Sequence, residues 1–283
     1  MNSPQKTPKI SDWLSSASKA LAVIGIESAR LDAEIILAHT IKKSRTYLHA
    51  HDDQELEPRH YEVAEARLSL RLDRTPIAYI IGHKEFYGRR FKVTPATLIP
   101  RPESEAMINL LKSLLKSEQQ ALLTADAKRL IDIGTGTGCL GISAKLELPM
   151  LDITISDMSN HALKVAETNA HALQADVRIL HSDLLEQYPF TPDIILANLP
   201  YVDKKWKRSP ETNYEPELAL FAENDGLALI FKLIDQASTR LARSGYLFLE
   251  ADPRQHAAIC DYAKQQSFTL QANDGFIIVL QKR

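Results

Sequence analysis

The sequence predicts an α/β fold in which a seven-stranded, mostly parallel sheet ends in an antiparallel hairpin and is preceded by a small helical domain. Two observations support this prediction. From about residue 130 onward, short apolar runs alternate with helical segments, a rhythm typical of a parallel sheet with both faces covered. Near the end of the chain, Asn273-Asp274-Gly275 joins two apolar runs by a tight turn that leaves no room for a crossover helix.

The N-terminal part of the sequence is predicted to be helical. Ser11-Asp12 is expected to cap a first helix that runs through Ile24, and a second helix covers residues 28–37. A third helix is predicted over residues 57–74, and Pro76 stops it. Its expected apolar stripe consists of Val63, Ala66, Leu68 and Leu70.

Glycine and proline residues mark a boundary after these helices. Gly82 and Gly88 bracket a short alternating segment and predict a hairpin. Three prolines follow within a few residues, which is typical of a linker. These features predict a helical domain at residues 1–74, a hairpin linker at 75–97 and an α/β domain at 98–283.

Strands and helices are expected to alternate in the α/β domain. Helices are predicted at 140–148, 161–172 and 226–242, and the last follows a long irregular stretch, 198–224. The predicted strands are 130–133, 153–155, 177–180, 193–197 and 246–249, followed by the hairpin strands 268–270 and 276–280. A mostly parallel, Rossmann-like sheet that finishes in an antiparallel hairpin is the seven-stranded methyltransferase arrangement.

Composition and charge limit the possible classes. The 34 Lys and Arg residues nearly balance the 36 Asp and Glu residues, so the formal net charge is −2. This balance disfavours direct nucleic-acid binding, although a local basic patch can lie within a neutral total. Two cysteines far apart in the sequence make no disulfide framework, and no apolar run reaches membrane-spanning length. We therefore expect a soluble, cytoplasmic protein with neither a membrane span nor a metal site.

A glycine-rich loop, Gly134-Thr135-Gly136-Thr137-Gly138, lies between a predicted strand and a helix. Glycine lets the backbone bend sharply and approach a ligand, and the helix N-terminus offers free N–H donors. A dinucleotide-binding loop would have Gly or Ala at position 139, where this chain has Cys139. The third glycine instead suits the amino-acid end of S-adenosyl-L-methionine. The alternative is a tight turn with a purely structural role.

Acidic residues follow the next two strands and suit the rest of that cofactor. Asp157 ends the second strand, where a carboxylate can accept both ribose hydroxyls, although it could also cap the following helix. After the third strand, Asp183 can accept from the adenine amino group while Leu184 packs on the ring. A turn aspartate is the alternative for Asp183. Three such elements in order after three successive strands favour a nucleoside site.

The segment Asn198-Leu199-Pro200-Tyr201 follows the fourth strand, at the edge where open parallel sheets bind ligands. Methyl transfer to a planar NH2 group requires the nitrogen lone pair to point at the methyl group. Two acceptors on the two N–H bonds, the Asn198 side-chain oxygen and the Leu199 carbonyl, can achieve this. Pro200 restricts the backbone of Leu199, and Tyr201 supplies an aromatic wall. A strand-end Asn before a proline turn is the structural alternative.

With these motifs, the chain resembles the release-factor glutamine N5-methyltransferases, the HemK-like family. The resemblance covers nearly the whole length and includes the segments 28–34, 76–82, 86–88, 98–105, 215–216, 219–220 and 225–227. It implies S-adenosyl-L-methionine as cofactor, bound by the 134–138 loop, Asp157, Leu184 and Asn198. It also implies that residues 198–201 receive the glutamine of a Gly-Gly-Gln loop. The helical domain would help to hold the peptide-chain release factor.

One departure from that family keeps alternatives open. The family usually has Asn-Pro-Pro-Tyr, and Leu199 replaces its first proline. Asn-Leu-Pro-Tyr resembles adenine-N6 methyltransferases of ribosomal RNA, so an enzyme acting on RNA or DNA is one alternative. The basic run 204–208, which contains Trp206, is consistent with it, although a solvated loop has the same composition. A non-catalytic cofactor-binding protein associated with translation is a second alternative.

Overall fold

The computed structural model describes residues 7–117 and 128–283. The described residues form two compact units. The smaller unit extends to Gly82 and includes the separate segment Ser209–Tyr214, whereas His83–Arg208 and Glu215–Arg283 belong to the larger unit. The functional division into residues 1–74, 75–97 and 98–283 stays a prediction, because compactness does not reveal what a unit binds.

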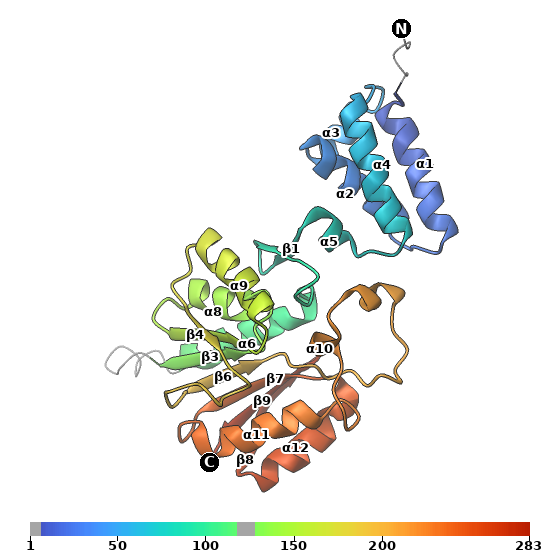
Figure 1. Cartoon of the computed structure of the whole chain (residues 1–283). Coiled ribbons are helices and arrows are strands. Elements are labelled where there is room, and N and C mark those ends of the chain that lie inside the picture. The colour runs from blue at the N-terminus through green and yellow to red at the C-terminus, as the bar shows by residue number, and fades with distance from the viewer. Residues whose placement is uncertain (1–6, 118–127) are drawn as a thin grey trace. The chain divides into compact units, whose positions relative to one another are not determined.

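The smaller unit is built from helices (Figure 1). Its elements are α1 (Ile10–Val23), α2 (Ala29–Ile41), α3 (Arg45–Ala50), α4 (Pro58–Leu72), α5 (Ile77–Ile81) and the 3-10 segment η2 (Pro210–Tyr214). The three predicted helices correspond to α1, α2 and α4, whereas α3 and α5 were not predicted. The predicted cap at Ser11-Asp12 is wrong, since α1 begins at Ile10 and Lys9 holds the cap position without a side-chain hydrogen bond.

The predicted apolar stripe on α4 is confirmed only at Leu68. Val63, Ala66 and Leu70 are exposed, whereas Ala64, Leu68 and Arg71 are buried. Arg71 can be buried because its guanidinium lies 2.7 Å from a carboxylate oxygen of Asp32 and 3.2 Å from one of Glu211. The buried face of α4 therefore combines apolar residues at helical spacing, Ala64 and Leu68 among them, with an ion-paired Arg71 that apolar periodicity does not indicate.

The larger unit contains the predicted seven-stranded sheet, in the order β5-β4-β3-β6-β7-β9-β8 (Figure 1). Its strands are β3 (Arg129–Ile133), β4 (Asp152–Asp157), β5 (Arg178–His181), β6 (Ile194–Ala197), β7 (Tyr246–Glu250), β8 (Phe268–Asp274) and β9 (Ile277–Lys282). All pairs from β5 to β7 are parallel, and β9 is antiparallel to both of its neighbours. The predicted topology is therefore confirmed.

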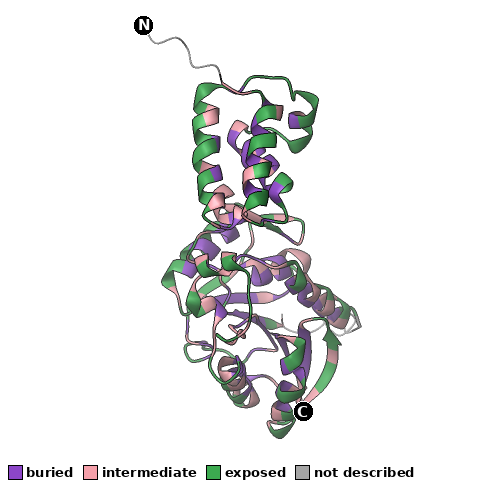
Figure 2. Ribbon diagram, turned by 90° about the vertical axis from the view of Figure 1, so that its right-hand side faces the viewer, coloured by how far each residue is buried: buried purple, intermediate pink, exposed green. Residues whose placement is uncertain are grey.

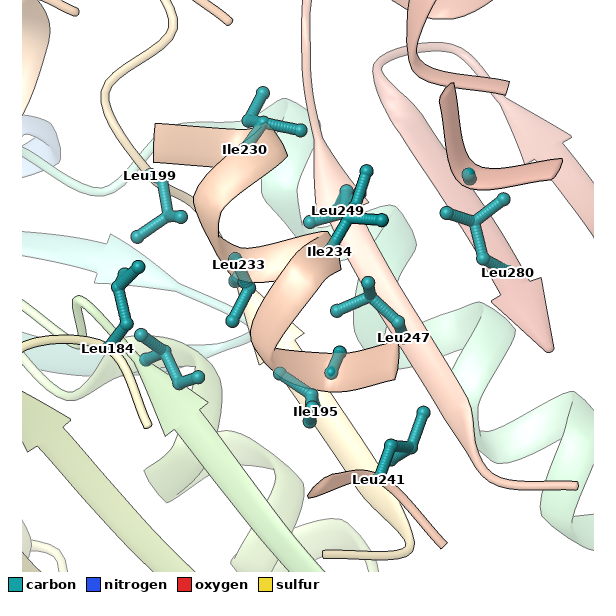
Figure 3. Close-up of a cluster of buried hydrophobic side chains, with 14 of the residues drawn as sticks. Leu184, Ile195, Leu199, Ile230, Leu233, Ile234, Leu241, Leu247, Leu249 and Leu280 are labelled. Carbon is teal, nitrogen blue, oxygen red and sulfur yellow. The ribbon is translucent and has the colours of Figure 1, made fainter. Parts of the chain in front are cut away.

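Helices cover both faces of this sheet. The covering helices are α6 (Glu105–Ser117), α8 (Cys139–Glu147), α9 (Asn160–Ala172), α11 (Ala228–Arg240) and α12 (His256–Gln265). Side chains alternate along each strand, so Leu130 packs in the core that contains α6, α8 and α9, and Ile131 in the core that contains α11 and α12. Figure 3 shows the second core around α11, and Figure 2 shows that the central strands of the sheet are mostly buried. The sequence did not predict α6 or α12.

The predicted hairpin is confirmed as β1 (His83–Phe86) and β2 (Arg89–Lys92). Tyr87 and Gly88 form its turn with φ values of 50° and 70°, as a tight two-residue turn requires. Asn169 on α9 fastens the hairpin by accepting from the Lys92 N–H (2.8 Å) and donating to the Lys92 carbonyl (3.0 Å). Within 7–117 and 128–283, no helix is long and apolar enough to cross a membrane.

Candidate active site

The predicted motifs meet at the carboxyl edge of the sheet. Ile133 at the end of β3 pairs with Ser156 on β4 and with Ala197 on β6, so the loops that follow these strands begin at one level. One cavity of the larger unit opens there. Of the predicted site residues, it is lined by Gly134, Thr135, Gly136, Thr137, Asp157, Asp183, Leu184, Asn198, Leu199 and Pro200. Gly138 and Tyr201 are absent from the cavity wall.

The glycine loop needs its glycines for two different reasons. Gly134, Gly136 and Gly138 all have positive φ, at 67°, 55° and 82°, a backbone region that other residues rarely adopt. A Cβ on Gly138 would also lie 2.6 Å from the Ile142 side chain. Gly138 therefore lets the loop turn tightly into α8, whereas Gly136 has open space around it on the cavity side.

A buried carboxylate lies beneath this loop. Asp132 accepts hydrogen bonds through Oδ2 from the Thr135 hydroxyl (2.5 Å) and from the Gly141 N–H (2.9 Å). Among the described residues, its Oδ1 has no hydrogen-bond partner although it is buried. Burial raises the pKa of Asp132 to about 7, and the two hydrogen bonds only partly oppose this rise. Asp132 is absent from the cavity wall, so its unpartnered oxygen marks a buried position that a water molecule can satisfy.

Asp157 has a structural role and also faces the cavity. Its Oδ1 accepts from the Ser159 N–H (2.8 Å) and its Oδ2 from the Gly136 N–H (3.0 Å), so it ties α9 to the glycine loop. The cap of α9 itself is Ser159. Burial raises the pKa of Asp157, although these N–H groups lower it. Each carboxylate oxygen keeps a second lone pair for another donor.

Asp183 and Leu184, which follow β5, differ in solvent exposure and in their hydrogen bonds. Asp183 is half-buried, and its Oδ2 accepts from the Lys232 ammonium at 2.7 Å, which leaves Oδ1 for a ligand. Leu184 is buried and has φ of 49°, while its carbonyl accepts from the Ser182 hydroxyl (2.8 Å). Leu184 and Leu199 lie on the same side of α11 in Figure 3, in one apolar cluster.

Side chains from distant segments hold Asn198. Its Nδ2 donates to the Ser104 hydroxyl oxygen (3.2 Å), and Ser104 donates to Oε2 of Glu250 (2.5 Å). The Tyr201 hydroxyl donates to Oε1 of the same carboxylate (3.2 Å). Sequence reasoning missed Ser104 and Glu250. Glu250 ends β7 as Asp157 ends β4, so a polar residue at a strand end was the available signal.

The backbone of Tyr201 is fixed from below. The Gln255 amide donates to the Tyr201 carbonyl (2.9 Å) and to the Asp225 carbonyl (2.8 Å). Gly226 has φ of 84°, and a Cβ there would lie 2.0 Å from the Tyr201 oxygen. Only glycine fits beneath this turn.

The basic run 204–208 packs on aromatic rings. Lys204 and Arg208 lie 5.8 and 4.9 Å from the Phe221 ring centre, and the Arg254 guanidinium lies 3.9 Å from that of Trp206. Since Arg254 covers one face of Trp206, that face is closed to base stacking. In the part of the chain that the structure describes, no group of three or more His, Cys, Asp or Glu side chains could hold a metal ion.

Comparison with known proteins assigns the class of fold first. A solved methyltransferase from Pyrococcus furiosus superimposes with a TM-score of 0.52 at 16% identity, covering 77% of this chain and 97% of that chain. The fold is therefore that of a methyltransferase. Family models agree: the PrmC N-terminal domain matches residues 12–82, and the methyltransferase small domain matches residues 109–213.

Sequence relatives assign the family. A release factor glutamine methyltransferase from Coxiella burnetii is 34% identical and is matched over 93% of its length and 99% of this chain. A bifunctional methyltransferase from Rickettsia bellii is 36% identical over 87% of this chain, which spans only 49% of that longer protein. The chain spans about half the length of such bifunctional relatives. It belongs to the release factor glutamine methyltransferase family.

Proposed function

We propose that this chain transfers a methyl group from S-adenosyl-L-methionine to the side-chain amide nitrogen (N5) of the glutamine in the Gly-Gly-Gln motif of a peptide-chain release factor. The observation that carries the proposal is that Asn198, Leu199 and Pro200 line the same cavity as the glycine loop and Asp157. An acceptor for NH2 hydrogens and a nucleoside site thus share one space. The family of the chain supplies the substrate class.

The residues along the cavity wall fit the cofactor. Gly134–Thr137 would approach its amino-acid end while Gly138 lets the loop turn into α8, and the second lone pairs on Asp157 would accept the ribose hydroxyls. Asp183 Oδ1 would accept from the adenine amino group, and Leu184 would pack on the ring. When bound, the cofactor supplies an electrophilic methyl group on a positively charged sulfur.

Asn198 and Leu199 would perform the positioning. The Asn198 side-chain oxygen and the Leu199 carbonyl each accept one N–H of the substrate amide, which directs the nitrogen lone pair at the methyl group. The N–C bond forms as the S–C bond breaks, and the nitrogen then loses one proton to solvent. Pro200 restricts the backbone of Leu199, and Tyr201, which is absent from the cavity wall, supports the segment through its hydrogen bond to Glu250.

The helical segment 1–74 is proposed to dock the release factor, with residues 75–97 as its connection to the catalytic part. It lies outside the set of residues that line the cavity. Such an enzyme would act in the cytoplasm, where release factors work on ribosomes.

A side-by-side methyl-transfer assay tests the proposal. Radiolabelled S-adenosyl-L-methionine is supplied with either a release factor or a structured RNA, and methyl incorporation is measured under single-turnover conditions. We expect methylation of the release factor alone. Methylation of the RNA alone would replace the proposal with an adenine-N6 activity, and transfer to neither would favour a non-catalytic binding protein.

A further inference from the structure

A continuous hydrogen-bond chain runs from the end of β7 to the cavity. It consists of Glu250, the Ser104 hydroxyl and the Asn198 side-chain amide, with oxygen–oxygen and nitrogen–oxygen distances of 2.5 and 3.2 Å. Glu250 and Ser104 are each only 2% exposed, so water cannot replace either of them easily. Asn198 and Ser104 both line the cavity, whereas Glu250 does not.

The chemistry of the three groups gives this chain a direction. An ionised carboxylate can only accept hydrogen bonds, so Ser104 must use its single proton toward Glu250. The Ser104 oxygen can then only accept from Asn198, which requires the amide NH2 group to face it. The Asn198 oxygen is consequently turned away from Ser104 and is left for another donor.

We propose that Glu250 is a positioning residue that, acting through Ser104, fixes which way the Asn198 amide faces and so keeps its oxygen available to the substrate NH2 group. This inference rests on the proposed role of Asn198 and deepens it. An unfixed amide can rotate by half a turn at little cost, and would then present two donors to an NH2 group that itself only donates.

The surroundings of Glu250 support an acceptor role. The Tyr201 hydroxyl donates to the other oxygen of Glu250 at 3.2 Å, so both carboxylate oxygens accept hydrogen bonds from neighbouring side chains. Burial raises the pKa of Glu250 overall, and hydrogen bonds from Ser104, Tyr201 and Asn198 only partly oppose this rise. The ionised carboxylate accepts these hydrogen bonds more strongly than the neutral acid does, and it is the state in which Ser104 donates to Glu250.

The test is a double-mutant cycle on the turnover number, made with the full chain. In Glu250→Leu, Ser104 loses its acceptor and turns its proton toward the Asn198 oxygen. We expect kcat to fall by roughly 100-fold, on the scale of losing one preorganised partner. Ser104→Ala alone removes the fixing contact without turning the amide, and we expect kcat to fall by roughly tenfold.

The double variant gives the distinctive result. Adding Ser104→Ala to Glu250→Leu removes the misdirected proton, so we expect kcat to rise above that of Glu250→Leu alone. A purely structural role would instead make the two losses add. The affinity for S-adenosylhomocysteine should stay within about threefold in all variants, since neither residue is assigned to its binding. Glu147→Leu, which removes another glutamate, one paired with Arg89 and Lys112, is the control and should keep full kcat.

The outcomes separate the inference from the proposed function. Each variant is compared with the wild-type chain on whichever NH2 acceptor the wild type methylates, glutamine or adenine. Additive losses, or an unchanged kcat in Ser104→Ala, would overturn the positioning role. If Glu250→Leu fails to fold, the kcat of Ser104→Ala tests the proposal by itself: a roughly tenfold loss supports the positioning role, and an unchanged kcat overturns it. If the wild-type protein methylates only adenine, the proposed glutamine substrate is wrong, but the positioning role of Glu250 is still tested by these variants.

Discussion

The glycine loop and the Asn198 segment follow adjacent strands, β3 and β6, yet they are held in different ways. The loop is fixed by its own sequence and by the next strand, through positive φ values and through hydrogen bonds that the loop donates to Asp132 and Asp157. The Asn198 segment is fixed by residues far away along the chain, Ser104 and Glu250 among them.

This difference teaches what each region is built for. A loop that binds a ligand with its backbone must adopt unusual φ values and come close to the ligand. Glycines within the loop itself are enough to allow both. An amide that must face one way needs a directional network, which several distant segments supply together. We therefore expect changes in the loop to affect cofactor affinity, and changes around Asn198 to affect rate.

The largest expected effect is on rate. Asn198→Ala removes one of the two acceptors that direct the substrate nitrogen, and we expect kcat to fall by about 100- to 1,000-fold. Calorimetric titration with S-adenosylhomocysteine should show a much smaller change in the dissociation constant. An active Asn198→Ala would overturn the mechanism.

A matched pair of glycines tests the support under Tyr201. Gly226→Ala places a Cβ 2.0 Å from the Tyr201 carbonyl at φ of 84°, whereas Gly275→Ala, at φ of 59°, meets nothing within 4 Å. We expect Gly226→Ala to lower the free energy of unfolding by roughly 2–4 kcal/mol and Gly275→Ala by about 1 kcal/mol. Urea unfolding measures both, and equal losses would show that the close approach to Tyr201 is unimportant.

Asp157→Ala should weaken cofactor binding. Two hydrogen bonds from the ribose to a charged acceptor are lost, so the dissociation constant for S-adenosylhomocysteine should rise by roughly 10- to 100-fold. Asp183→Ala is the comparison, and its effect should be only about threefold because that partly exposed carboxylate is already paired with Lys232. If the folded Asp157→Ala protein binds as tightly as wild type, Asp157 is only the structural tie between the loop and α9.

The smallest expected effect is a pH dependence of stability from Asp132. Its pKa is about 7 in the folded chain, well above its value when unfolded, so the folded state keeps a proton that the unfolded state has lost. Stability is therefore lost as pH rises toward 7, by roughly 1 kcal/mol between pH 6 and pH 7. Asp132→Asn should flatten this slope in urea unfolding series. If the free energy of unfolding of Asp132→Asn changed with pH as steeply as that of the wild type, a group other than Asp132 would cause the pH dependence.

The two regions also explain which features the sequence could predict. The mostly parallel sheet, the terminal hairpin and the glycine loop follow from local pattern, so they were predicted and are observed in the structure. Burial of Arg71 on α4 depends on Asp32, and the orientation of Asn198 depends on Ser104 and Glu250. Such pairs are far apart in sequence, and neither periodicity nor composition indicates that they meet.

Leu199 shows the same limit on a smaller scale. The sequence presented it only as a source of a carbonyl group, in place of a proline. In the structure its side chain is also buried, and a Cβ on Gly134 would lie 3.1 Å from it. Leu199 therefore packs beneath the glycine loop and connects the two regions, which sequence spacing alone could not reveal.

Mapping of the transferred methyl group tests the central claim most directly. A release factor is incubated with S-adenosyl-L-methionine and either the wild-type chain or Asn198→Ala, and tandem mass spectrometry locates the modification. A matched release factor with the motif glutamine replaced by alanine is the control substrate. We predict one methyl group on the side-chain nitrogen of that glutamine, with wild type only. Methylation of the control substrate, or of the glutamine by Asn198→Ala at the wild-type rate, would contradict this account.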